Sequence, residues 1–196
     1  MRAYQLTAIR FSALAATFFL GGSAEAGSIP LGSWLEFSFT TAGTQAKGCD
    51  PADAAGAFCF ESSGTPSSFL DAPPWTFNST LATYLTVTDA FVSGDRFSIL
   101  DFNAPLAQTS VPTPPADCGD DPAVCLATYG MSNAVVLLSA GNHSLSIVPT
   151  TSLGGGSAFL RVDEVPEPGA GALIAFGLLS IIWRFFKIES RKERRR

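Results

Sequence analysis

The residues of this 196-residue chain best suited to chemistry are its four cysteines and its acidic side chains. In an oxidising compartment an even number of cysteines predicts two disulfides, for which three connectivities are possible. The spacing favours the two local pairs, each closing a short loop rich in Gly, Pro, Asp and Ala. Zinc is the competing interpretation, but the chain has no C-x-x-C pair and a single histidine. The expected disulfides therefore join Cys49 to Cys59 and Cys118 to Cys125.

Calcium is the metal that the acidic residues would suit. Asp117, Asp120 and Asp121 place three carboxylates on one loop, which the second disulfide would hold. Hard cations take carboxylate and carbonyl oxygens on loops of this kind. No EF-hand or repeat signature is present, so solvated turn carboxylates are the default interpretation. We expect no resident metal or cofactor, with calcium at this loop as the alternative.

The residues that catalysis would need are few. His143 is expected in a surface turn, and no G-x-S-x-G elbow is present. The glycines at 154–156 lack the Lys and Ser/Thr of a P-loop and are expected to provide flexibility between strands. A carboxylate pair for glycoside hydrolysis would have to be close in space rather than in sequence. Its candidates are Glu36, Asp89, Asp95 and Asp101. We predict no catalytic residue and no enzyme activity.

The N-terminal residues predict a secretory signal peptide at 1–26. Two arginines precede the apolar stretch 11–20, and an A-x-A cleavage sequence follows. The twin arginines of the Tat route are absent, so we expect export through the Sec translocon and processing by signal peptidase. The expected cut lies before Gly27, and the cleavage-site residues are Ala24, Ala26 and Gly27.

The C-terminal residues form a three-part tail. A Pro-Glu-Pro motif at 165–168 precedes a mostly apolar run at 169–188 and a basic end at 189–196. The prolines favour extended chain, which is the form that a protease binds. As a helix, the run of 20 residues is long enough to cross a hydrocarbon core of about 30 Å. The positive-inside rule then leaves the basic end in the cytoplasm and everything before the motif outside. A buried amphipathic helix is the alternative, but the run has no polar stripe.

This tail resembles the PEP-CTERM sorting signal of Gram-negative bacteria. The resemblance implies processing by an exosortase-type membrane protease at or near the motif. It also implies a precursor anchored in the inner membrane, and then a protein at the cell surface or outside the cell. The residues expected in processing and sorting are Val165, Pro166, Glu167, Pro168, Arg184, Arg194, Arg195 and Arg196.

Charge in the exported part is strongly acidic. Of the 17 acidic and 12 basic residues, 13 and 3 respectively lie between Gly27 and Val165, a net charge of about −10. Such a balance argues against nucleic acid and anionic lipid surfaces as partners. It is compatible with neutral sugars or divalent cations.

Alternating apolar residues predict strands throughout the exported part and no helix. Residues 33–39 read as a first strand, and a glycine turn at 93–95 predicts a hairpin between 84–92 and 97–102. Residues 40–68 and 103–128 are expected to be long loops. The fold class is therefore all-β: a single antiparallel β-sandwich or jelly-roll domain at 27–164, flanked by a signal helix and a transmembrane helix. Residues 75–165 also resemble the bodies of many PEP-CTERM proteins and related secreted β-sandwiches.

These observations favour an exported, non-enzymatic surface or matrix protein, which the resemblance associates with exopolysaccharide and biofilm. The alternative is a carbohydrate-binding module, or an accessory to a polysaccharide hydrolase. Its binding residues would be sugar-stacking aromatics, for which the candidates are Trp34, Trp75 and Tyr84. Aromatic residues on strands more often belong to a core.

Overall fold

The structure, a computed structural model, describes residues 27–166. The signal peptide expected at 1–26 and the tail from 167 onwards lie outside the described residues. Within 27–166, no helix is long and apolar enough to cross a membrane. The elements are β1 (Gly27–Ser28), β2 (Trp34–Phe39), β3 (Cys49–Asp50), β4 (Ala57–Phe58), β5 (Ser67–Phe69), β6 (Trp75–Ser79), β7 (Thr83–Asp89), β8 (Arg96–Asp101), β9 (Ala104–Gln108), α1 (Pro122–Ala127), β10 (Asn133–Leu138), β11 (Gly141–Thr151) and β12 (Gly156–Glu164).

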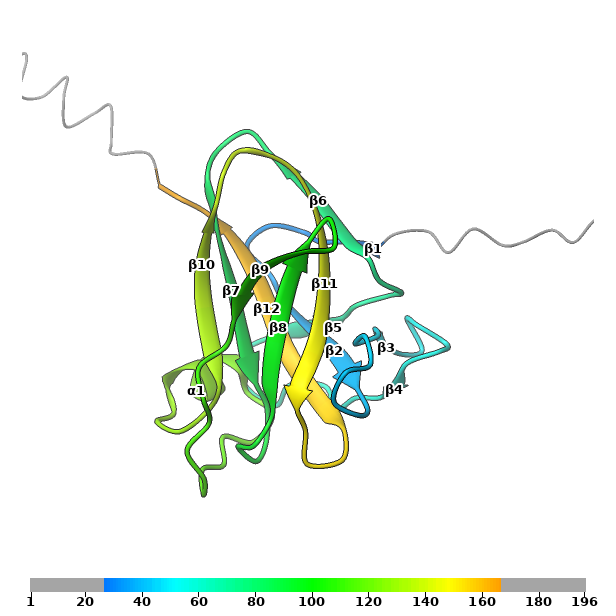
Figure 1. The fold of residues 1–196 in the computed structure, drawn as a ribbon, viewed down its shortest axis with the longest axis vertical. Coiled ribbons are helices and arrows are strands. Elements are labelled where there is room, and N and C mark those ends of the chain that lie inside the picture. Colours follow the sequence, from blue (N-terminus) through cyan, green and yellow to red (C-terminus); the bar gives the residue numbers. More distant parts are fainter. Residues whose placement is uncertain (1–26, 167–196) are drawn as a thin grey trace, which may run out of the picture.

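Two five-stranded sheets face each other (Figure 1). The first sheet has the order β1-β6-β11-β8-β9, and the second sheet has the order β10-β7-β12-β2-β5. The all-β prediction is confirmed, but the sheets are mixed rather than antiparallel. The edge strands β1 and β5 pair in parallel with β6 and β2. Long connections make this geometry accessible, because β2 and β5 are separated by most of the loop expected at 40–68.

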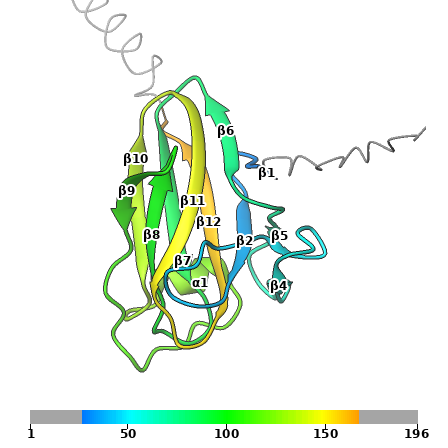
Figure 2. The ribbon, with the colours of Figure 1, turned by 45° about the vertical axis from the view of Figure 1, so that its right-hand side comes forward.

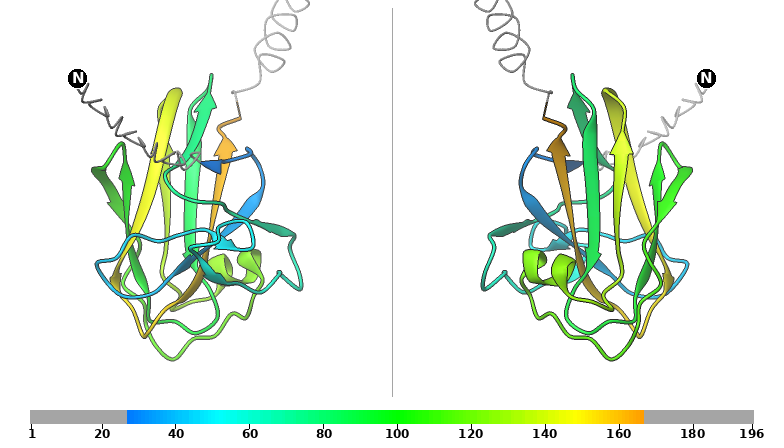
Figure 3. Two further views of the ribbon diagram at one scale, coloured as in Figure 1. Left: turned by 90° about the vertical axis from the view of Figure 1, so that its right-hand side faces the viewer. Right: turned by 90° about the vertical axis from the view of Figure 1, so that its left-hand side faces the viewer.

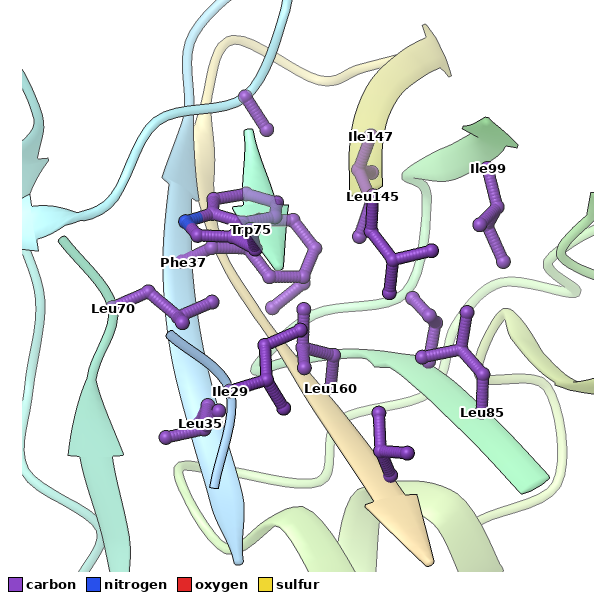
Figure 4. Packing of buried hydrophobic residues seen from close by; sticks show 14 of the residues in the cluster. Ile29, Leu35, Phe37, Leu70, Trp75, Leu85, Ile99, Leu145, Ile147 and Leu160 are labelled. Carbon is purple, nitrogen blue, oxygen red and sulfur yellow. The ribbon is translucent and has the colours of Figure 1, made fainter. Parts of the chain in front are cut away.

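The core of the described residues lies between the two sheets. On β2, Leu35, Phe37 and Phe39 point inward, as the alternation predicts. The ring of Phe37 lies 5.5 Å from that of Trp75 on the facing sheet, and Trp75 is fully buried (Figure 4). Leucine and isoleucine side chains of β11, β8 and β7 complete the cluster, among them Leu145, Ile147, Ile99 and Leu85.

The expected hairpin between 84–92 and 97–102 is wrong. β7 pairs with β10 and β12 in the second sheet, whereas β8 pairs with β11 and β9 in the first. The link between β7 and β8 therefore crosses from one sheet to the other. Phe91 in this link has a φ of 55°, and Gly94 has a nearly extended φ of 159°. The connection from β10 to β11 crosses between the sheets in the same way. Alternation indicates which face of a strand is buried, but it does not identify the neighbouring strand.

A second, smaller cluster covers the outer face of the second sheet. It joins Trp34 and Phe159 to residues of the second disulfide loop. β2 is consequently buried at all six positions, on both of its faces. Figure 2 shows the segment with β4 and β5 projecting beside β2. Figure 3 shows the short helix α1 next to the second sheet. The second sheet thus has a loop layer on its outer face as well as the core on its inner face.

Helix α1 is the element that the alternation does not predict. It starts at Pro122, a residue favoured in the first turn of helices. The Asp121 side chain caps it by accepting hydrogen bonds from the amides of Ala123 and Val124. The Cys118–Cys125 disulfide ties the helix to the preceding loop, with a Cα–Cα distance of 4.8 Å. The helix has six residues and is stabilised by its cap and one disulfide. It is therefore too short to show an apolar periodicity in the sequence.

We call residues 27–166 with both disulfides formed the oxidised body. Trp75→Ala should destabilise it by about 3–5 kcal/mol, because the change opens a large cavity between the sheets. Tyr84→Ala is the matched control, since Tyr84 is 40% exposed, and should change the free energy of unfolding by less than about 1 kcal/mol. Denaturant unfolding followed by far-UV circular dichroism measures both. Similar losses in the two variants would contradict the assigned core.

Candidate functional site

The predicted sorting motif begins where the last described strand ends. β12 finishes at Glu164, and the amide of Val165 donates to the Ala82 carbonyl at 2.8 Å. Pro166 is exposed beyond this bond. Of the remaining sorting residues, all lie outside the described part: Glu167, Pro168, Arg184, Arg194, Arg195 and Arg196. The motif therefore follows directly on a strand of the second sheet, with no linker between them.

The predicted signal cleavage site lies at the other end of the described chain. Ala24 and Ala26 are outside the described residues, but Gly27 is buried and opens β1. Its amide donates to the Ala72 carbonyl at 3.2 Å. The residue that follows the expected cut is therefore already paired in the first sheet.

Both predicted disulfides are present. Cys49 and Cys59 are bonded with a Cα–Cα distance of 5.6 Å, and Cys118 is bonded to Cys125. All four residues are buried, so the bonds are protected from thiols in solution. Among residues 27–166, one group of three possible metal ligands has its ligand atoms within 4.8 Å of one another: Glu36, Cys49 and Cys59. The two cysteines are joined in a disulfide, so they offer no thiolate to a metal.

The three carboxylates proposed for calcium have structural partners. The Asp117 carboxylate accepts from the Gly119 amide at 2.9 Å, and the Asp120 carboxylate accepts from the Ser63 hydroxyl at 2.7 Å. Asp121 caps α1 and also accepts from the Thr65 amide at 3.1 Å. Asp120 and Asp121 therefore bind the two disulfide loops to each other. Calcium binding at this loop stays a prediction.

Glu36 is a fully buried carboxyl group on the outer face of β2, beside the Cys49–Cys59 disulfide. Burial raises the pKa of Glu36 from 4.5 to about 7; the nearby Ser157 opposes this shift, and the charge of Asp120 adds to it. Neither carboxyl oxygen has a hydrogen-bond partner among the described residues. Ser157 is therefore near the Glu36 carboxyl group but does not form a hydrogen bond with it. The uncharged carboxylic acid is the form that suits this position.

Asp89 and Asp95 are the two candidate carboxylates that the fold brings together. Asp89 accepts from the amides of Ala90 at 3.0 Å and Asp95 at 3.3 Å. Burial, followed by the charge of Asp95, raises the pKa of Asp89 to about 8. Burial also raises the pKa of Asp95, against the hydrogen bond that its carboxylate accepts from the Leu153 amide at 2.9 Å. The pair joins the links 90–95 and 152–155. Both residues are buried, and Asp95 also lines a small hollow of about 190 Å³ between these links.

The expectation of a surface turn at His143 is wrong. His143 lies on β11 opposite Phe77, is buried, and stacks on the Phe77 ring at 4.8 Å. Its Nδ1 is 2.7 Å from the Asp101 carboxylate, and its Nε2 is 3.0 Å from the Ser139 carbonyl, to which it donates. Asp101 also accepts from the Ser144 amide at 2.9 Å. Both ring nitrogens are engaged, so the ring supports the strand end and is not free to act as a base.

The sugar-stacking platform considered for Trp34, Trp75 and Tyr84 is wrong, and the core interpretation holds for both tryptophans. Trp75 lies between the sheets, and Trp34 belongs to the outer cluster. The guanidinium of Arg161 is 5.8 Å from the centroid of the Trp34 ring and covers it. Tyr84 is partly exposed on β7.

A different group of aromatic residues is exposed. Phe58 and Phe60 flank Cys59 and are 69% and 59% exposed. Their ring centroids are 5.2 Å apart, and Phe60 lies 5.9 Å from Phe91. The three rings border a hollow of about 330 Å³, which we call the phenylalanine groove. Its other lining residues are Phe39, Thr40, Ala57, Gly154, Gly155, Gly156 and Ser157.

The sequence contained one signal of this groove. Two large apolar residues on either side of a bridged cysteine cannot both point inward in a short loop, since the bridge fixes the direction of Cys59. The contribution of Phe91 was not predictable, because it depends on the link that crosses between the sheets. The triple glycine at 154–156 allows the chain to pass close to Phe39, where Gly155 has a φ of 100°.

No family model and none of the curated proteins matches this chain. Among solved structures, the C-terminal CBM6 of LamC, a marine laminarinase from Zobellia galactanivorans, is similar at 14% sequence identity. The match spans 65% of this chain and 98% of that chain, with a TM-score of 0.32. Similarity at this level bears on neither ligand nor activity.

We predict that stability decreases as pH rises, because Glu36 and Asp89 are neutral more readily in the folded than in the unfolded protein. Both carboxyl groups have a higher pKa in the folded than in the unfolded protein. The stabilisation that comes from keeping them protonated is therefore complete below about pH 4. It is lost as the pH passes through about 7 for Glu36 and about 8 for Asp89. Glu36→Gln should therefore gain about 1–3 kcal/mol over the wild type between pH 5 and pH 8.

Denaturant unfolding of the oxidised body at several pH values measures this gain. Glu61→Gln is the control, since Glu61 is exposed and its neutralisation should give a difference that does not change with pH. A Glu36→Gln profile parallel to that of the wild type would show that the Glu36 carboxyl is not the group responsible.

Proposed function

We propose that this chain is an exported, non-enzymatic cell-surface or extracellular-matrix protein, sorted by its PEP-CTERM-type tail and associated with exopolysaccharide or biofilm. The observation that carries this proposal is the pairing of all four cysteines in two buried disulfides. Structural disulfides persist in oxidising compartments outside the cytoplasm. They support an extracytoplasmic body between the two export-type ends of the sequence.

The position of the motif also supports a sorting role. All pairings of β12 with β2 and β7 are made before Val165. Cleavage at or after the motif would leave these pairings intact, so the tail could be removed without unfolding the body. The chain leaves the body at the end of β12, where Figure 1 shows the last described residues.

The roles of the polar residues support a non-enzymatic function. Asp89 and Asp95 join two links, Asp120 and Asp121 bind two loops, and Asp101 holds His143. Each of these side chains has a structural partner.

Changing Pro166-Glu167-Pro168 to three alanines should leave the full-length protein in the inner membrane, because membrane insertion depends on the apolar run and processing on the motif. Replacing Arg194, Arg195 and Arg196 by serine should spare insertion, which depends on the apolar run, but weaken orientation and sorting. Cell fractionation and intact mass of protein from the native host measure both. Normal processing of the triple-alanine variant would show that the tail is an ordinary anchor.

The second candidate is a carbohydrate-binding module, and the phenylalanine groove is the observation that favours it. Exposed aromatic rings offer apolar faces against which the C–H groups of a sugar can pack. The groove has no charged side chain in its lining, and the body around it is acidic. A neutral polysaccharide therefore suits this groove better than an anionic one.

Phe60→Ala should weaken binding of the body to a neutral polysaccharide about tenfold, equivalent to about 1.4 kcal/mol, because it removes the ring shared by both aromatic pairs. Phe102→Ala is the matched control, since Phe102 is 61% exposed outside the groove. Affinity electrophoresis against neutral and anionic polysaccharides measures the change. Equal loss in both variants, or no binding by the wild type, would exclude the groove as a sugar site.

A further inference from the structure

The first residues of the described body are fixed in the first sheet. Gly27 and Ser28 pair in parallel with Trp75 and Thr76. The Ile29 amide donates to the Thr76 carbonyl at 2.9 Å, and the Ile29 side chain belongs to the core. The backbone immediately after the expected cleavage site therefore has one defined position.

A carboxylate lies against the backbone of Gly27. Asp71 Oδ1 occupies the space that a Cβ on Gly27 would take, and Trp75 Cδ1 lies 2.9 Å from that Cβ position. The Trp75 indole holds this arrangement by donating to the Asp71 carbonyl at 2.9 Å. A side chain at position 27 would displace the Asp71 carboxylate and press on the Trp75 ring.

The number of donors at Gly27 changes when the preceding peptide bond is hydrolysed. The peptide nitrogen carries one N–H, which is donated to the Ala72 carbonyl. Hydrolysis adds water across the Ala26–Gly27 bond: Ala26 keeps the new carboxylate, and the Gly27 amine takes up a proton. The resulting ammonium has three N–H donors, of which two are free for a second acceptor. No hydrogen bond to the Asp71 carboxylate is formed by any residue of 27–166, so this acceptor is available.

We propose that Asp71, together with the Ala72 carbonyl, forms a binding site for the α-ammonium group that export processing creates at Gly27. The inference rests on the proposed function, because it requires cleavage before Gly27. The ion pair would fasten β1 to β6 and close the edge of the first sheet over Trp75. The uncleaved precursor has no charge at this nitrogen, so the mature protein would have a contact that its precursor lacks.

Two oxidised proteins that differ by one residue test this site: residues 27–166 and residues 26–166. Both carry one terminal ammonium, but in the longer protein it is displaced by up to about 3.5 Å along the chain. We expect the 27–166 protein to melt about 1–3 °C higher at pH 6 and low salt, as for one exposed ion pair. The difference should shrink in 1 M NaCl, where exposed charges are screened.

Asp71→Asn in both lengths completes the cycle and should reduce the melting difference to less than about 1 °C. Glu61→Gln in both lengths is the control, because it removes an exposed carboxylate elsewhere and should leave the difference unchanged. An equal difference with and without Asp71→Asn overturns the binding site. A first residue other than Gly27, found by intact mass of the native protein, overturns instead the processing step on which the inference rests.

Discussion

The burial of β2 on both faces is the constraint on which the rest of this structure depends. Its inward residues meet the first sheet, as in any sandwich, but its outward residues are buried as well. An outer face of this kind requires a cover, and the two disulfide loops provide it. The loops bury too little apolar surface to stay in place unaided, which explains both the disulfides and the contacts of Asp120 and Asp121 between them.

The acidic groups whose ionisation opposes folding lie on strands of the second sheet and in the link that follows one of them. Glu36 on β2 lies beside the Cys49–Cys59 disulfide, and Asp89 at the end of β7 accepts from the amide of Asp95 in the following link. A rise in pH therefore acts on β2, β7 and the link that follows β7, so it lowers the stability of the oxidised body as a whole.

Local information in the sequence was sufficient for the longer core strands and the disulfides. The expectation of long loops at 40–68 and 103–128 was wrong in part, because the short strands β3, β4, β5 and β9 lie there and bury too few residues to show an alternation. Alternation placed Leu35, Phe37 and Phe39 inside, and short spacing paired the cysteines correctly. Partners between strands were not predictable in this way, because a strand such as β7 can bury its apolar face equally well in either sheet. His143 and the phenylalanine groove were missed for the same reason. Each depends on residues distant in sequence: Asp101 for the histidine, and Phe91 with 154–156 for the groove.

The two ends of the body differ in a way that matters for maturation. β12 lies in the middle of the second sheet, with both of its neighbours paired before the sorting motif begins, so removal of the tail leaves the sheet unchanged. β1 is a two-residue edge strand whose first residue is also the first after the expected signal cleavage. β1 is held by its pairing with β6 and by the adjacent Ile29, whose amide donates to the Thr76 carbonyl. Processing at the C-terminus would therefore leave the paired strands unchanged, whereas processing at the N-terminus would change the chemistry at the edge strand β1.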